Sequence, residues 1–309
     1  MQRLLTTATI AGLLIATAAA FAITERLKLT KSAVYGTHVS TRLSPTCGCA
    51  RGKATIFFKL RRRDHITVTV VNARKDEVAL LSDATVAAGP VRLRWDGETE
   101  AGTRAPDGTY YARIHLQGGH QTITLPNPML LDTKPPLVLL VQKNRDQFSP
   151  DHDRQADYVR LTYRLSKPAH LLLFLNGKKI LGPTHSHVAS GSVAWYGTAG
   201  GRTLPAGFYT LEVGALDQAG NSTPVAKRVG VTVEIRYIAL AAHRIVVRAG
   251  SRFEIGVSTD AKRYAWKLGQ RKGEAAGPVL RVRAPKQRGS YTLLVEERGH
   301  LDRARVVAR

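Results

Sequence analysis

Two stretches of the chain repeat the same succession of residue types. Residues 95–110 read WDGETEAGTRAPDGTY, and residues 195–209 read WYGTAGGRTLPAGFY. Trp95 and Trp195 stand 100 residues apart, and Tyr110 and Tyr209 stand 99 apart. The chain of 309 residues therefore contains two copies of a unit of about 100 residues, which is the size of one domain.

Each repeated residue type has a structural role. The tryptophan closes a strand and is large enough to fill the space between two sheets. The glycine two residues later allows a positive φ in a tight turn, and the Pro-x-Gly turns the chain into the next strand. The tyrosine begins that strand, packs its ring inward and hydrogen-bonds back to the corner. The motif residues are Trp95, Asp96, Gly97, Pro106, Gly108 and Tyr110, then Trp195, Gly197, Pro205, Gly207 and Tyr209.

Short alternating runs make up the rest of the chain from about Val39 onward. ATIFFKL at residues 54–60 and HITVTVV at 65–71 are examples, and two later runs at 158–165 and 170–175 predict two separate strands. No long stretch follows a helical period. Strands at this spacing, with turn residues between them, are typical of antiparallel sandwiches or barrels. The predicted fold class is all-β: tandem immunoglobulin-like (Ig-like) β-sandwiches after an N-terminal transmembrane helix or signal sequence.

Trp-Asp-Gly followed by Pro-Asp-Gly-x-Tyr resembles the Ig-like domain of the FlgD family of flagellar hook-capping proteins. FSPDHDRQAD at residues 148–157 is similar to the pattern FSP-(N/D)-G-D-G-x-N-D of such modules, and DQAGNS at 217–222 is similar to the D-x-A-G-N close of bacterial Ig-like domains. The resemblance covers roughly residues 40–235. It implies Ig-like repeats of a secreted or membrane-anchored bacterial protein. The hook-binding part of a full hook-capping protein has no counterpart.

The repeats divide the chain into four predicted parts. The Lys134-Pro135-Pro136 stretch forms a short stiff junction between the copies, and Gly289-Ser290-Tyr291 resembles the tyrosine corner of a third sandwich. The parts are a signal anchor or transmembrane segment and stalk at 1–32, FlgD-type Ig-like domains at 33–136 and 137–235, and a small basic Ig-like sandwich at 236–309.

The N-terminal run from Leu4 to Ile23 has 20 residues without a charge. At ~1.5 Å per residue a helix of this length spans the hydrocarbon core of a bilayer. Small-x-small patterns at residues 16–18 and 20–22 also suit a cleaved signal peptide. Because the run is long for a signal peptide, we expect a single-pass plasma-membrane protein with an extracellular body. Secretion after cleavage is the alternative.

The chain contains two cysteines, Cys47 and Cys49, which excludes disulfide-scaffold, zinc-finger and iron–sulfur classes. In an oxidising exterior we expect the two thiols to form a local disulfide that stiffens the start of the first domain. A redox role, a Cu(I) site and intermolecular pairing are the weaker alternatives.

Three aspartates, Asp151, Asp153 and Asp157, have the alternate spacing of a calcium loop. Such a loop needs six to eight oxygen ligands and glycines at its tight turns. His152 and Arg154 stand where the pattern has glycine, so we interpret the segment as a degenerate site that serves as a turn. We therefore predict no cofactor and no metal, with these aspartates as a weak candidate.

The chain carries 46 Lys and Arg against 23 Asp and Glu, a net charge of +23 that argues for an anionic neighbour. Alternation in residues 278–283 places Leu280 and Val282 in the core and Arg281 and Arg283 in solvent. The candidate polyanion-binding residues of the third domain are Lys262, Arg263, Lys267, Arg271, Lys272, Arg281 and Arg283.

No sequence motif of a known enzyme class was found, including G-x-S-x-G, H-E-x-x-H, the P-loop and G-x-G-x-x-G. We expect a non-enzymatic, membrane-anchored extracellular protein for structural spacing, adhesion or binding of anionic cell-envelope polymers. Its expected partners are the membrane, wall polymers or other envelope proteins, and not nucleic acid in vivo. The alternatives are an assembly scaffold or chaperone for an exported, flagellum-like organelle, and an accessory module of a secreted enzyme system.

Overall fold

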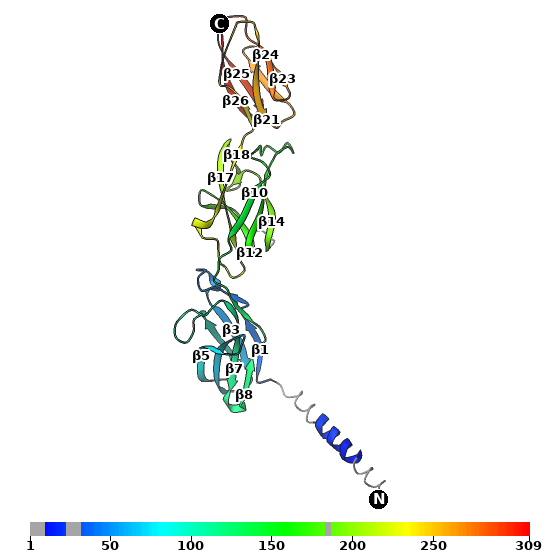
Figure 1. Cartoon of the computed structure of the whole chain (residues 1–309), viewed down its shortest axis with the longest axis vertical. Coiled ribbons are helices and arrows are strands. Elements are labelled where there is room, and N and C mark those ends of the chain that lie inside the picture. The colour runs from blue at the N-terminus through cyan, green and yellow to red at the C-terminus, as the bar shows by residue number, and fades with distance from the viewer. Residues whose placement is uncertain (1–9, 23–31, 183–186) are drawn as a thin grey trace. The chain divides into compact units, whose positions relative to one another are not determined.

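The computed structural model describes residues 10–22, 32–182 and 187–309 (Figure 1). These residues fall into two compact units, Met1–Thr133 and Lys134–Arg309. Strands dominate both units, and the predicted all-β class of Ig-like sandwiches is confirmed. The boundary between the units falls between Thr133 and Lys134, and the predicted domain boundary after Pro136 stays a prediction.

The first unit is a sandwich of two sheets. One has three strands in the order β1-β3-β6, and the other has six, in the order β2-β9-β7-β4-β5 with β8 paired to β7. The strands are β1 (Val34–Val39), β2 (Arg42–Leu43), β3 (Ala54–Leu60), β4 (Asp64–Asn72), β5 (Glu77–Val86), β6 (Gly89–Trp95), β7 (Gly108–Leu116), β8 (Gln121–Thr124) and β9 (Met129–Leu131). Short 3-10 turns lie at η1 (Ala50–Gly52) and η2 (Gln117–Gly119).

Alternation along the strands builds the core of this sandwich. In β3 the residues Ala54, Ile56, Phe58 and Leu60 are buried, because successive side chains of a strand point to opposite faces. Trp95, only 1% exposed, lies in the same core. The tryptophan therefore occupies the space between the sheets, as the motif predicts.

The second unit begins with a sandwich organised around one long strand, β12 (Val159–Leu175). Its first half pairs with β10 and β14, and its second half pairs with β13 and β17. The other strands are β10 (Val138–Lys143), β11 (Gln147–Phe148), β13 (Lys178–Leu181), β14 (Val188–Trp195), β15 (Thr198–Ala199), β16 (Arg202–Thr203), β17 (Gly207–Leu216) and β18 (Val229–Ile235), with a 3-10 turn at η3 (Val225–Lys227).

The sequence pattern indicates two strands where the structure has this single long one. The break expected between Leu165 and His170 is instead a register irregularity between Arg164 and Ala169. Pro168 lies in this stretch and has no N–H to donate to a ladder, so hydrogen bonding is interrupted while the backbone stays extended.

The second unit ends with a smaller sandwich, which we call the third sandwich. Its sheets have the orders β19-β21-β24 and β20-β26-β25-β22-β23. The strands are β19 (Ile238–Leu240), β20 (Arg244–Val247), β21 (Arg252–Thr259), β22 (Tyr264–Leu268), β23 (Arg271–Ala275), β24 (Val279–Arg283), β25 (Gly289–Glu297) and β26 (His300–Ala308). Its buried side chains form a cluster distinct from that of the preceding sandwich. The finer division at residue 236 stays a prediction.

A helix covers residues 10–22. Within the described part of the chain, no helix combines the length and the apolar character needed to cross a membrane. The predicted transmembrane segment is therefore not supported by this helix. Residues 4–9 and 23 of the uncharged run lie outside the described residues.

Candidate functional site

The corner motif of the first sandwich is held by short local hydrogen bonds. Trp95 Nε1 donates to the carbonyl oxygen of Glu98 at 2.8 Å, and the Asp96 carboxylate accepts from the backbone N–H of Glu98 at 3.2 Å. The Tyr110 hydroxyl donates to the carbonyl oxygen of Pro106 at 2.6 Å. The Trp95 and Tyr110 rings lie 4.8 Å apart, so the motif closes one corner of the core.

The second sandwich repeats this arrangement. Trp195 Nε1 donates to the carbonyl oxygen of Thr198, and the Tyr209 hydroxyl donates to that of Pro205, both at 2.9 Å. The remaining glycines of the motif begin the strands that carry the two tyrosines, Gly108 in β7 and Gly207 in β17. The motif therefore has a structural role in both sandwiches.

The turn glycines of the motif pack against a proline from a preceding loop. Gly97 has φ +84°, and a Cβ there would lie 2.6 Å from Pro45 Cγ. Gly197 has φ +65°, and a Cβ there would lie 2.8 Å from Pro150 Cγ. No larger side chain therefore fits at either glycine. Because each proline packs against the same motif glycine, the loops that follow Pro45 and Pro150 begin at equivalent positions of the two sandwiches.

In the first sandwich this loop carries the cysteines. The structure joins Cys47 and Cys49 by a disulfide, and the backbone N–H of Cys47 donates to the carbonyl oxygen of Ser44 at 3.2 Å. The bond closes a loop of a few residues just before η1. This placement suits a local staple.

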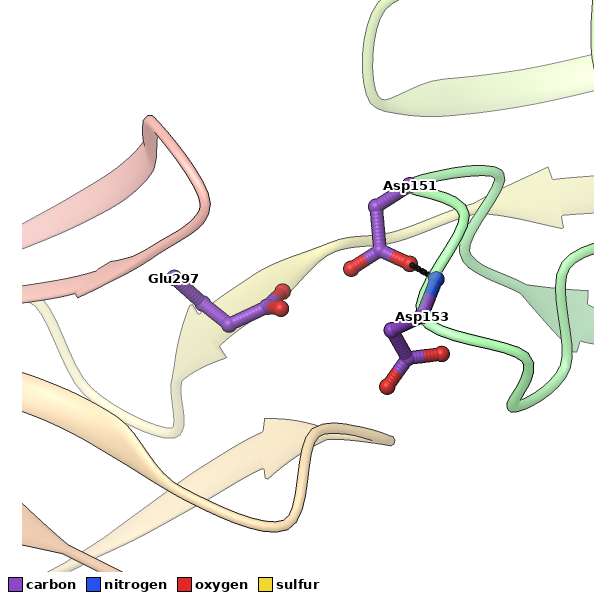
Figure 2. Close-up of side chains that lie close together, drawn as sticks. All are labelled: Asp151, Asp153 and Glu297. Carbon is purple, nitrogen blue, oxygen red and sulfur yellow. Dashed lines mark hydrogen bonds between the residues drawn. The ribbon is translucent and has the colours of Figure 1, made fainter.

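In the second sandwich the equivalent loop carries carboxylates that meet the third sandwich. Oxygen atoms of Asp151, Asp153 and Glu297 all lie within 4.8 Å of one another. Figure 2 shows the two aspartates on one loop, with Glu297 reaching toward them from a different segment. Asp157 is outside this group, and its carboxylate accepts from the backbone N–H of Arg154 at 2.9 Å. The structure therefore brings two of the three predicted aspartates together and adds Glu297. We call these three residues the acidic cluster.

The loop's own hydrogen bonds orient the aspartates. The backbone N–H of Asp153 donates to Asp151 Oδ1 at 3.2 Å, and that of Gln155 donates to Asp153 Oδ1 at 2.6 Å. Three residues that replace the glycines and asparagine of the family pattern have positive φ: His152, Arg154 and Ala156. The loop thus keeps the left-handed turns that glycine favours, although the glycines are gone.

Burial raises the pKa values of two carboxyl groups here. Glu297 is 5% exposed, and its Oε2 has no hydrogen-bond partner among the described residues. Burial, with the interaction of Asp151 next in size, raises the pKa of Glu297 to about 8. Burial likewise raises the pKa of Asp260 to about 6, and the charges of Asp151 and Asp153 add to the effect. The buried carboxylates therefore favour a proton or a cation.

A pocket of about 720 Å³ adjoins the acidic cluster, and Asp153, Glu297, Lys262 and Arg263 are among its lining residues. Arg263 pairs with Glu274 at 2.9 Å. Two of the predicted polyanion-binding residues thus lie beside acidic groups.

A second hollow of about 720 Å³ on the third sandwich is lined by four arginines. Arg252 and Arg283 are register partners on β21 and β24, and Arg281 faces Glu254 with an Nε to Oε1 distance of 2.7 Å. Glu254 is the one acidic residue among the described lining residues. We call this hollow the arginine groove; its arginines are Arg252, Arg271, Arg281 and Arg283.

The two sheets of the third sandwich contribute to the arginine groove together. Arg271 lies on the edge strand β23, opposite the buried Leu268, so it projects from the inner face of its sheet. Its Nη1 donates to the carbonyl oxygen of Arg283 at 3.3 Å. Lys267 and Lys272 are paired on β22 and β23 and exposed on the outer face. The predicted basic set is therefore divided among three places.

Sequence reasoning missed Glu297, Asp260 and Arg252. Glu297 continues the inward phase of Leu293 and Val295 along β25, which is a readable sign of burial. Its meeting with the aspartates depends on how the third sandwich packs, which no local pattern encodes.

Parts of the chain are similar to known proteins. The family model described as FlgD Ig-like domain matches residues 50–119. Fibronectin(III)-like modules of Clostridium thermocellum CbhA share 15% identity, with 64% of this chain and 93% of theirs covered, at a TM-score of 0.31. A structure of a bacterial ice-binding adhesin shares 11% identity, with 90% and 98% covered, at a TM-score of 0.30. A search of curated protein sequences gave no match.

The match to the family model covers the Trp95 to Tyr110 motif and the strands on either side of it. Both sandwiches with this motif close the corner with the same hydrogen bonds. The chain is thus built of Ig-like β-sandwich repeats, and residues 50–119 match the family model of the FlgD Ig-like domain.

Proposed function

We propose that the protein works outside the cytoplasm as a non-enzymatic string of Ig-like sandwiches that spaces and binds anionic polymers of the cell envelope. The N-terminal segment either anchors the chain in the plasma membrane as a single pass or is removed after export. A disulfide between Cys47 and Cys49 suits an oxidising exterior. The observation that carries the proposal is the arginine groove.

The chemistry of the arginine groove favours phosphate. A guanidinium group offers several N–H donors in a plane and binds phosphate oxygens in pairs. Four such groups line the groove against one glutamate, and all four arginines are exposed. Because salt screens charges beyond ~8 Å, attraction at physiological ionic strength requires direct contact. A phosphate-bearing wall polymer would give that contact along the groove.

Arg252 and Arg283 are the residues that best test this function. They are register partners, and Arg281 is already paired with Glu254. The matched control is Lys267 with Lys272, an exposed pair on the outer face of β22 and β23. Reversing either pair to glutamate changes the net charge equally, so a difference between them reports the site and not the total charge.

The experiment measures binding of the full chain to a poly(glycerol phosphate) polymer across a salt series. At about 1 kcal/mol for each basic residue, reversal of Arg252 and Arg283 is expected to weaken binding by about thirtyfold or more at low salt. The control pair should have a several-fold smaller effect. Equal effects of the two double variants, or no binding of the wild-type chain at low salt, would reject the groove as a polymer site.

The FlgD Ig-like match at residues 50–119 favours a second candidate, a scaffold for assembly of an exported organelle. Its test is organelle assembly in cells that lack the protein. Normal assembly of the organelle in these cells would reject the scaffold function. Failed assembly that the Arg252 and Arg283 double variant restores would favour a scaffold over polymer binding.

A further inference from the structure

The acidic cluster points to a function separate from polymer binding. We propose that Asp151, Asp153 and Glu297 bind one calcium ion that joins the second sandwich to the third. The aspartates lie on the loop that follows β11, and Glu297 is the last residue of β25 (Figure 2). An ion held by all three would connect two separate hydrophobic cores.

The spacing of the oxygens fits calcium better than magnesium. Calcium–oxygen distances of about 2.3–2.6 Å allow two ligands of one ion to lie up to about 5.2 Å apart, whereas magnesium at about 2.1 Å allows about 4.2 Å. The oxygens of the acidic cluster lie within 4.8 Å of one another. Calcium therefore fits this spacing with little movement, whereas magnesium would require the three carboxylate oxygens to move closer together.

Glu297 provides a second, independent indication of a ligand. Its side chain is 4% exposed, and Oε2 has no hydrogen-bond partner in the described part of the chain. Figure 2 shows the carboxylate directed at the two aspartates. A buried carboxylate without a partner is destabilising, and a cation at this point would relieve that cost.

Further oxygens are available to complete the coordination shell. Both carboxylate oxygens of Asp260 are buried, as is the hydroxyl of Ser149, which is 1% exposed. Asp260 directly precedes Ala261 and Lys262, which line the pocket beside the acidic cluster. The six to eight oxygens that calcium prefers can therefore come from these groups and water.

Several positively charged side chains lie close to the acidic cluster, which limits the affinity expected for calcium. Arg298 Nε lies 3.6 Å from Glu297 Oε1, so it leaves the other carboxylate oxygen, Oε2, without a partner. Arg298 Nη1 donates to the carbonyl oxygen of Asp151 at 3.2 Å. Arg154, on the same loop as the aspartates, lines the adjoining pocket together with Arg298. Lys262 and Arg263 line the adjoining pocket, where Arg263 pairs with Glu274.

The test is calcium titration of the full chain, purified in detergent, followed by calorimetry and by thermal unfolding. The variants are Glu297→Gln and Asp151→Asn, with Glu296→Gln as the matched control because Glu296 is the exposed neighbour on the same strand. Wild type should bind one calcium ion with a dissociation constant of about 0.1–1 mM, as extracellular modules do, and its unfolding temperature should rise with calcium. Magnesium should bind at least about tenfold more weakly.

Glu297→Gln should lose about tenfold or more in calcium affinity and lose the calcium-dependent rise in unfolding temperature. Without calcium it should unfold at the same or a higher temperature than wild type, because the amide removes a buried charge. This result distinguishes a lost ligand from a misfolded protein, and Asp151→Asn should lose affinity in the same way. No binding by wild type at about 10 mM calcium, or unchanged affinity in both variants, would overturn the proposal.

Discussion

Gly197→Ala tests the link between the corner motif and the loop that carries the aspartates. At φ +65° an added Cβ costs about 1–2 kcal/mol in backbone strain. That Cβ would also lie 2.8 Å from Pro150 Cγ and 3.1 Å from Ile235 Cδ1, and overpacking of this kind costs about 1–3 kcal/mol. We expect the free energy of unfolding of the second sandwich, which contains Gly197, to fall by about 2–5 kcal/mol.

Gly200→Ala is the matched control. Gly200 has φ +58°, and an added Cβ would meet nothing within 4 Å among the described atoms, so only the backbone cost of about 1–2 kcal/mol applies. Hydrogen exchange of β17 and β18, measured by mass spectrometry on the full chain, reports the opening free energy of this sandwich separately from the others. Equal losses in the two variants would refute the argument that Gly197 is required by the close approach of Pro150.

Two further outcomes are expected. Burial raises the pKa of Glu297 from 4.5 to about 8, so the fold is more stable when this carboxyl group is protonated. In EDTA, the contribution of protonated Glu297 to the free energy of unfolding should be complete below about pH 4.5. It should be lost as the pH rises through about 8. The difference in unfolding temperature between wild type and Glu297→Gln, measured at several pH values in this range, reports this contribution. A difference that does not change with pH would contradict the burial of this charge. Replacing Cys47 and Cys49 by serine should lower stability by less than about 2 kcal/mol, because a loop this short removes little unfolded-state entropy. Urea unfolding of the first unit checks this, and a larger loss would mean that the disulfide does more than close a local loop.

The sequence predicts the features whose determinants are local. The Tyr110 hydroxyl reaches Pro106, four residues earlier, and Trp95 reaches Glu98, three residues later. These contacts depend only on the turn between two strands, so the spacing of the motif is sufficient to predict them. Alternation likewise predicts the exposure of Arg281 and the burial of Val282 in β24.

Contacts between distant segments could not be predicted in this way. Glu297 meets Asp151 only because the third sandwich packs against the loop of the second. Arg271 reaches Arg283 only because the two sheets meet at β23. Local composition encodes neither event. The alternating pattern also predicts two strands in place of β12. Pro168, which lies between them, interrupts the hydrogen bonds without ending the extended backbone.

Protease treatment of intact cells that express the chain with a C-terminal tag shows whether the sandwiches lie outside the cytoplasm. Mass analysis of the mature N-terminus in the same fractions tells whether residues 1–32 are retained. We expect added protease to remove the tag from intact cells, or the tagged chain to be found in the medium. A full-length tagged chain that is protected in intact cells and recovered in the cytosolic fraction would contradict it.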